Sequence, residues 1–237
     1  MKVALLRVGI DSGSGGGQGP LFRDGSFEYL PIPDGFGLDE RTYGNTLGRH
    51  GRYLADYLAP SLRARLLHSS MHVDPEFAAF TYGDPTPPKS GLRRLVEGDM
   101  LVFYCGLEGF GFASAPALYI MGYFEILIAG KATDFASDDI DRLFGENFHV
   151  RHRGVFERQR SELVLVKGSR TSRLLSKAVC ISDTTTDRTG KPLKVLSEEM
   201  QRRFGGFGGR ISIQRSPTRW VEDAFTSRAA EFVRSLE

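Results

Sequence analysis

Cysteine is scarce in this chain, which has two cysteines, Cys105 and Cys180, among 237 residues. Two cysteines cannot form the disulfide framework of a small secreted protein, and without a Cys-x-x-Cys pair the sequence lacks the common zinc motifs. Both cysteines lie inside apolar runs, "MLVFYCGL" and "KAVCIS". The sequence therefore predicts two buried, reduced thiols.

Long apolar segments are missing as well. The longest one, "ALYIMGYFEILIAG", is interrupted by Gly122 and Glu125, and the first residues lack the basic region and apolar stretch of a signal peptide. We therefore expect a cytoplasmic protein with no membrane partner. The net charge is only +2, which neither requires nor excludes nucleic acid, because such binding depends on where charges cluster.

What the chain does contain is an ordinary globular composition, with 41% hydrophobic and 25% charged residues. Apolar runs with the length of strands occupy residues 2–10, 97–107, 118–130, 161–168 and 177–182. A hairpin is predicted over 21–33, with its turn at Asp24-Gly25. Amphipathic segments predict helices over 43–67 (broken near Pro60), 137–145 (with Ser137 as N-cap), 197–206 and 218–236.

These elements do not alternate as regular strand–helix–strand units. The pattern favours a single α+β domain over residues 1–237, with a mixed sheet, short flanking helices and a C-terminal amphipathic helix.

The stretch "GIDSGSGGGQGP", residues 9–20, follows the first predicted strand and resembles a phosphate-binding loop. Its glycine spacing does not fit the dinucleotide fingerprint, it contains no lysine for a Walker A loop, and a hairpin follows it instead of a helix. A polyglycine turn still allows a ligand to approach the backbone closely. The polar residues that could line such a pocket are Asp11, Ser12, Ser14 and Gln18, and the alternative is a flexible surface loop.

Histidines and carboxylates suggest a second site. The order His72-x-Asp74, followed by His149 or His152, is that of the 2-His-1-carboxylate iron site of oxygenases. If residues 149–152 form a strand, only one of these two histidines can join the site. Arg158 or Arg160 could bind the carboxylate of an oxo-acid cosubstrate. Alternatively, the pair at 149 and 152 lies on a solvated or nucleic-acid-facing edge.

The segment "HVDPEF" also offers acid–base chemistry. The candidate catalytic residues are His72, Asp74 and Glu76. The alternative for the two carboxylates, which flank Pro75, is that they cap the start of a helix.

A third candidate is the basic segment "KGSRTSRLLSK", which follows a predicted strand. Cations and hydroxyls at a strand-to-helix junction suit phosphate oxygens. The expected anion-binding residues are Lys167, Ser169, Arg170, Ser172 and Arg173. The alternative is an exposed polar turn followed by an amphipathic helix.

Several segments together resemble the third of the nucleotide-modification-associated domain families: "KVALLRVGIDSGSGGGQGPLFRDGSFEYLPIPD", "HVDPEFAAFTYGD", "GDMLVFYCGL", "YIMGYFEI" and "SRLLSKAVCIS". The resemblance covers nearly the whole chain and implies a link to DNA or RNA base modification. More distantly, "LRRLVEGDMLVFYCGL" followed by "LYIMGYFEI" is similar to the middle of PUA-like barrels, including the EVE branch. That likeness implies a barrel-forming sheet and recognition of RNA or of modified bases.

The sequence therefore favours a protein that binds a nucleotide or a nucleic-acid base within a base-modification system. One alternative is a non-catalytic PUA-like reader of modified nucleic acid, and another is an iron-dependent base oxygenase. An enzyme should bury a polar cluster in a deep pocket, whereas a reader should have an aromatic-walled cleft rimmed by Arg and Lys. Beyond the iron of the oxygenase alternative, the sequence specifies no cofactor.

Overall fold

The computed structural model describes residues 1–11, 13–214 and 217–236 and has a mixed α+β fold. The strands are β1 (Val3–Arg7), β2 (Gly19–Leu21), β3 (Ile32–Pro33), β4 (Met71–His72), β5 (Thr81–Asp84), β6 (Met100–Gly109), β7 (Ala117–Lys131), β8 (Val164–Gly168), β9 (Arg173–Cys180), β10 (Ser182–Thr186), β11 (Pro192–Leu196) and β12 (Arg219–Trp220). The α-helices are α1 (Pro60–Leu66), α2 (Ser137–Phe144), α3 (Phe148–Arg151), α4 (Arg153–Gln159), α5 (Glu198–Phe204) and α6 (Thr226–Arg234). Short 3₁₀ turns are η1 (Leu54–Tyr57), η2 (Pro87–Arg94), η3 (Ala132–Asp134) and η4 (Asp223–Phe225).

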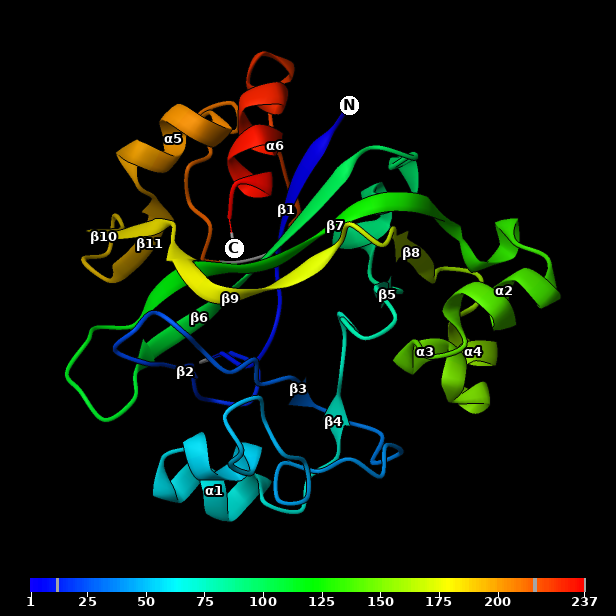
Figure 1. The fold of residues 1–237 in the computed structure, drawn as a ribbon, viewed down its shortest axis with the longest axis horizontal. Helices are drawn as coiled ribbons and strands as arrows, with labels where there is room; N and C mark the ends of the chain where they lie inside the picture. Colours follow the sequence, from blue (N-terminus) through cyan, green and yellow to red (C-terminus); the bar gives the residue numbers. More distant parts are fainter. Residues whose placement is uncertain (12, 215–216, 237) are drawn as a thin grey trace.

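One mixed sheet organises the molecule (Figure 1). Its strands follow the order β12-β1-β6-β7-β8-β5, with β2 added to β6 and β9 added to β7. Strands β1 and β2 pair with β6 in parallel, while β7 pairs antiparallel with β6, β8 and β9. The described strands leave the sheet open, with β12 and β5 at its ends, so the barrel implied by the PUA-like resemblance does not close.

The predicted apolar runs form the centre of this sheet. Every residue of β6 from Met100 to Leu107 is buried, because the strand has neighbours on both edges and packing on both faces. Helices α5 and α6 pack against each other, and α6 contacts β1. Helices α2 to α4 lie together at one end of the long axis, and α1 lies on the other side of the sheet from α5 and α6 (Figure 1).

Two local predictions are confirmed by the backbone. The hairpin turn lies at Asp24-Gly25, where Gly25 has a φ of 86° and donates to the Phe22 carbonyl. Helix α5 begins after Ser197, whose side chain accepts a hydrogen bond from the Met200 amide. Helix α2 was also predicted, but Ser137 is its first helical residue and its N-cap is Ala136.

The helix predicted over residues 43–59 is wrong, since regular α-helix begins only at Pro60. Gly44 approaches the Leu67 carbonyl so closely that an added Cβ would lie 2.6 Å from that oxygen, and Gly51 has a φ of +72°. The C-terminal helix starts at Thr226 and not near residue 218, because residues 219–220 pair with β1 as strand β12. Cys105 is buried as predicted, whereas Cys180 is exposed at the end of β9.

In the described part of the chain, no helix is both long enough and apolar enough to cross a membrane.

Candidate metal centre and its cavity

Three side chains from separate elements converge beside the sheet. His72 ends the short strand β4, which pairs with β3, and Asp74 follows it two residues later. His149 comes from α3, whose N-cap Asn147 accepts a hydrogen bond from the His149 amide at 3.1 Å. This cap fixes the start of the helix and therefore the direction in which its second residue points.

The donor atoms of the three residues lie within 4.8 Å of one another. Asp74 Oδ2 is 3.6 Å from His149 Nε2 and 3.9 Å from His72 Nε2. The side chains of Asp74 and His149 are each only 4% exposed, and that of His72 is 20% exposed. The structure thus brings together His72, Asp74 and His149, which the sequence offered as a possible metal-binding set.

These donors lack the partners that buried polar atoms normally have. His72 Nε2, His149 Nε2 and Asp74 Oδ1 are buried without a hydrogen bond, while Asp74 Oδ2 accepts one from the Gly83 amide at 2.8 Å. His149 Nδ1 lies 2.7 Å from Gln159 Oε1. Because a carboxamide oxygen only accepts, His149 carries its proton on Nδ1, and its Nε2 presents a lone pair to the cluster.

The electrostatics of the cluster favour neutral imidazoles. Burial lowers the pKa of His72 to about 3, with a further contribution from the neighbouring His149. Burial also lowers the pKa of His149, although the hydrogen bond to Gln159 acts in the opposite direction. Burial raises the pKa of Asp74 well above its usual range. Without a cation nearby, the Asp74 carboxylate is therefore disfavoured in its charged form.

The arrangement has the composition and spacing of a metal site. First-row divalent ions bind imidazole nitrogen and carboxylate oxygen at about 2.0–2.2 Å, so two ligands at a right angle are about 3 Å apart. The distances from Asp74 Oδ2 to His149 Nε2 and to His72 Nε2, 3.6 and 3.9 Å, are somewhat longer than that value, so the side chains must draw together around an ion. Two imidazoles and one carboxylate on one side of an ion leave its other positions open to substrate.

The cluster opens onto a cavity of about 470 Å³. Its described lining includes Arg7, Val8, Gly9, Asp11, Gly13, Ser14, Ile32, His72, Asp74, Tyr82, Gly83, Asp84, Lys89 and Gln214. This volume is in the usual range for sites that bind small molecules.

The glycine-rich loop contributes part of this wall. Asp11 Oδ1 accepts hydrogen bonds from the amides of Gly13 (2.7 Å) and Ser14 (2.6 Å), and its Oδ2 pairs with Arg7 at 3.1 Å. Asp11 and Ser14 line the same cavity as His72 and Asp74. Gln18 lines a separate cavity beside Pro20, and Ser12 lies outside the described residues.

Two cations of the cavity wall were not anticipated from the sequence. Arg7 ends β1, and its side chain is 11% exposed. Lys89 belongs to η2 and is 7% exposed; burial lowers its pKa, while the charge of Asp84 raises it. The only sequence signal for Arg7 is its position at a strand end, and nothing in "TPPKSG" distinguishes Lys89.

Other predicted site residues lie elsewhere. His152 Nε2 is 3.9 Å from Asp39 Oδ2, and its ring packs against Phe148 instead of joining the cluster. Since residues 148–151 are helical, the argument based on a strand does not apply to this pair. Arg158 stacks over Phe36 and Arg160 over Phe156, so neither is among the described lining of the cavity.

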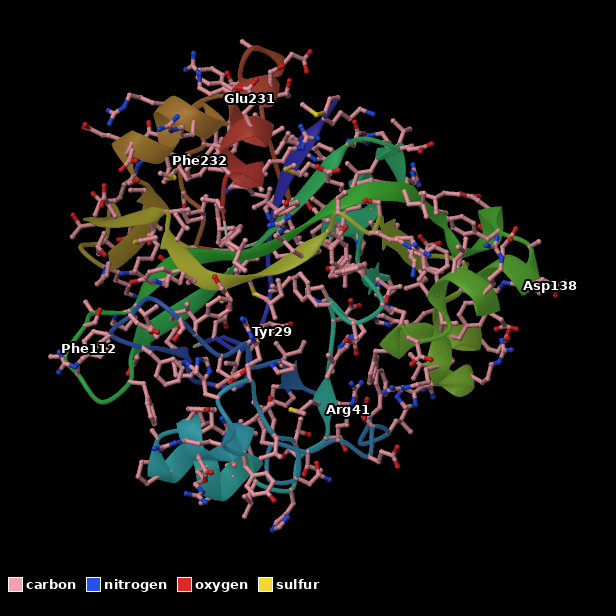
Figure 2. All side chains as sticks on the ribbon, in the orientation of Figure 1. Tyr29, Arg41, Phe112, Asp138, Glu231 and Phe232 are labelled. Atoms are coloured by element: carbon pink, nitrogen blue, oxygen red, sulfur yellow. The ribbon has the colours of Figure 1, made fainter. Side chains whose placement is uncertain are left out.

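Glu76 faces away from the metal cluster. Its carboxylate accepts hydrogen bonds from Arg41 (3.2 Å) and from the Ala78 amide, and it lines a second cavity with Tyr29 and Arg41. Figure 2 labels Tyr29 and Arg41, which lie on the side of the sheet that faces α1. The proposal that Asp74 and Glu76 cap a helix is wrong, because no helix begins there and Glu76 bridges to Thr81.

The basic segment 167–177 is not a strand-to-helix junction, since β8 turns directly into β9. Lys167 Nζ donates to the Ala79 carbonyl at 2.6 Å, and Ser172 Oγ accepts from the Glu125 amide at 3.1 Å. Arg173 lies over the ring of Tyr123, and Ser169 bonds to Thr171.

The Glu125 carboxylate accepts a hydrogen bond from Thr171 in the same turn. Lys167, Ser169 and Ser172 are therefore occupied by contacts within the protein, whereas Arg170 and Arg173 are exposed.

Comparison with known protein families places the chain. A family model described as nucleotide modification associated domain 3 matches residues 2–235, nearly the whole chain, and so confirms the resemblance noted in the sequence. Its description links the chain to nucleotide modification in general. No curated protein and no solved structure matches the chain.

Proposed function

Because the chain belongs to the nucleotide modification associated domain 3 family, we propose that it is a metal-dependent enzyme that modifies a nucleotide base. His72, Asp74 and His149 would hold a ferrous ion, and the base would enter the adjacent cavity. The observation that carries this proposal is the convergence of three buried donor atoms without protein partners. Leaving such atoms unpaired costs about 1–3 kcal/mol each, and a bound cation removes that cost.

The donor set also favours a reaction class. Two histidines and one carboxylate are the ligands of non-haem iron oxygenases, which need dioxygen and an electron source such as a 2-oxo acid. In such a reaction one oxygen atom enters the substrate as a hydroxyl group. The other enters the acid that forms when the 2-oxo acid releases carbon dioxide.

The protein's own residues have separate tasks in this proposal. Gln159 keeps the proton of His149 on Nδ1, so Nε2 remains free to bind the ion. Arg7 and Lys89 supply positive charge to the wall of the cavity. Arg7 pairs with Asp11 through Nη2, and its Nε is buried without a hydrogen bond, so its remaining donors can contact the carboxylate of an oxo acid or the phosphate of a nucleotide.

The cavity wall disfavours the alternative of a non-catalytic reader. Its aromatic rings, among the described lining residues, are those of Tyr82 and His72. A modified base held by recognition alone is usually stacked between aromatic walls. Most of the described lining residues are polar or charged, and they surround His72 and Asp74, which supports an enzyme.

The proposal is tested by metal binding and activity together. Purified protein is titrated anaerobically with Fe(II), and metal content is measured by native mass spectrometry for the parent, His149→Ala and the matched control His152→Ala. We expect one ion per chain in the parent and the control, and loss of that ion in His149→Ala. The loaded protein is then incubated with nucleotides and oligonucleotides, dioxygen and a 2-oxo acid, and products are sought by mass.

A metal content that is equal in both variants would contradict the site. A bound ion without any oxygen-dependent mass change would contradict the oxygenase reaction and leave a hydrolytic metal enzyme as the better description.

A further inference from the structure

A second region of interest is an exposed basic surface outside the cavity. Four exposed cations, Arg23, Arg49, Arg52 and Lys177, come from the turn of the first hairpin, the loop before η1 and strand β9. Within the described part of the chain, none of the four lies in an ion pair. The carboxylate of Asp24 interacts electrostatically with one of them, Lys177, without forming an ion pair.

Three of these cations lie over phenyl rings. The guanidinium carbon of Arg23 is 5.0 Å from the ring centre of Phe112, and that of Arg52 is 5.8 Å from the ring centre of Phe110. Arg49 lies 5.4 Å from the ring centre of Phe27, and its Nη1 donates a hydrogen bond to the Leu175 carbonyl at 2.9 Å. Such stacking restricts an arginine without using its hydrogen-bond donors.

The cations belong to one continuous surface. Phe22, in the hairpin, contacts both Phe110 and His50, with ring centres 5.7 and 4.3 Å apart. Ser26 bridges to Lys177 on β9. We call this surface, made of the hairpin turn, residues 47–53, Phe110, Phe112 and Lys177, the arginine–phenylalanine face.

The position of this face is distinct within the molecule. The loop that joins β6 to β7 lies at the end of the long axis opposite α2 (Figure 1), and Figure 2 labels Phe112 on that loop. Arginines near α2 are different, because Arg142 pairs with Asp139 at 2.6 Å and Arg153 with Asp141 at 3.2 Å. Arg142 and Arg153 of the helical end are therefore paired with aspartates, although Arg158 in α4 stacks over Phe36 without an ion pair among the described residues. The four cations of the loop end form no ion pair in the described part of the chain.

The face also contains one charged carboxylate at its turn. Hydrogen bonds from the Ser26 hydroxyl and amide lower the pKa of Asp24, with a smaller contribution from the charge of Lys177. Asp24 therefore fixes the turn through Ser26 and does not form an ion pair with the arginines.

We propose that the arginine–phenylalanine face binds the phosphate backbone of a nucleic acid. Nucleic acid carries regularly spaced negative charges, and arginine side chains held on aromatic rings suit both phosphates and exposed bases. The claim that a bound nucleic acid is also the substrate rests on the function proposed above. The claim that this face binds nucleic acid does not.

The test measures binding of labelled 20-nucleotide single- and double-stranded oligonucleotides at several salt concentrations. The key variant is Arg23→Ala/Arg52→Ala, and the matched control is Arg142→Ala/Arg153→Ala. We expect at least about tenfold weaker binding in the key variant and a salt slope smaller by about two, because about one counterion is released per lost phosphate contact. The control should bind as the parent does, and thermal unfolding of both variants should match the parent.

Binding that is equal in the key variant and the control would overturn the proposal, as would a parent that binds neither oligonucleotide. Anionic lipid vesicles serve as a second probe, and binding to vesicles without binding to oligonucleotides would identify a membrane partner and contradict it as well. His72→Ala is measured in parallel without metal. Unchanged oligonucleotide binding in that variant would show that binding at this face does not depend on the metal site, so the two proposals can fail independently.

Discussion

The metal cluster and the β8–β9 turn both concentrate polar side chains, but their hydrogen bonds differ. At the cluster, Nε2 of His72 and His149 and Oδ1 of Asp74 are buried without partners. At the turn, Lys167 donates to a backbone carbonyl, and Ser172 accepts from a backbone amide. Three unpaired donor atoms gathered in one cluster indicate a missing ligand, whereas satisfied groups indicate a structural role.

The largest effect on metal binding is expected from removing the negative charge of Asp74 in the metal cluster. Asp74→Asn keeps the shape of the side chain but removes the negative charge that a divalent ion needs. We expect affinity for Fe(II) to fall more than about 100-fold, while the metal-free protein becomes more stable, because burial disfavours the Asp74 carboxylate. Anaerobic titration and thermal unfolding with a chelator measure the two effects. A loss of both metal binding and stability would indicate a structural carboxylate instead.

A smaller effect is expected at the residue that orients His149. Gln159→Leu removes the acceptor for the Nδ1 proton, so Nε2 is no longer held free to bind metal. We expect affinity for Fe(II) to fall about 10–100-fold, with recovery in Gln159→Glu. The unfolding temperature of the metal-free protein provides the control for simple misfolding. Equal affinity in the leucine and glutamate variants would mean that Gln159 has no positioning role.

The pH dependence of stability tests the buried state of His72. Its folded-state pKa is about 3, below the ordinary 6.5, so between these values the unfolded chain binds a proton that the folded chain does not. This contribution to stability is complete above pH 6.5 and is lost as the pH falls, by about 1 kcal/mol per pH unit. Denaturant unfolding of metal-free parent and His72→Gln should therefore converge as the pH is lowered. Parallel curves from pH 7 to 4 would contradict the burial of a neutral imidazole.

The smallest effect is expected at the β8–β9 turn. Arg170→Ala/Arg173→Ala removes two exposed charges, one of which lies over Tyr123. We expect nucleotide binding in the cavity to change less than twofold and stability to change by less than about 0.5 kcal/mol. Calorimetric titration with nucleoside monophosphates measures the former. A tenfold loss of affinity for the nucleotide would show that the β8–β9 turn is an anion-binding site after all.

Sequence patterns predicted those parts of the molecule that depend on local chemistry. The apolar runs of β6 and β7 and the Asp24-Gly25 turn were recognised because burial on both faces and a positive φ leave clear signals. The same reasoning gave a wrong prediction for residues 43–59. Their apolar spacing resembles a helix, but contacts such as the one between Gly44 and Leu67 hold a compact loop.

The candidate site could likewise be predicted only in part from the sequence. His72 and Asp74 were identified because they are close in sequence, whereas the choice between His149 and His152 depends on a helix of four residues that is too short to show periodicity. Arg7 and Lys89 were missed because they are far apart in the sequence and come to line the same cavity only in the folded protein. Asp11 was identified from its loop, but no local pattern indicated that its carboxylate would pair with Arg7.

The central claim is that one ion fits among His72, Asp74 and His149, and anomalous scattering from crystals grown with Co(II), a substitute for ferrous iron, tests it most directly. We predict a single strong peak about 2.0–2.2 Å from Nε2 of both histidines and from a carboxylate oxygen of Asp74. A map without a peak among these atoms, or with its strongest peak at other residues, would contradict the account.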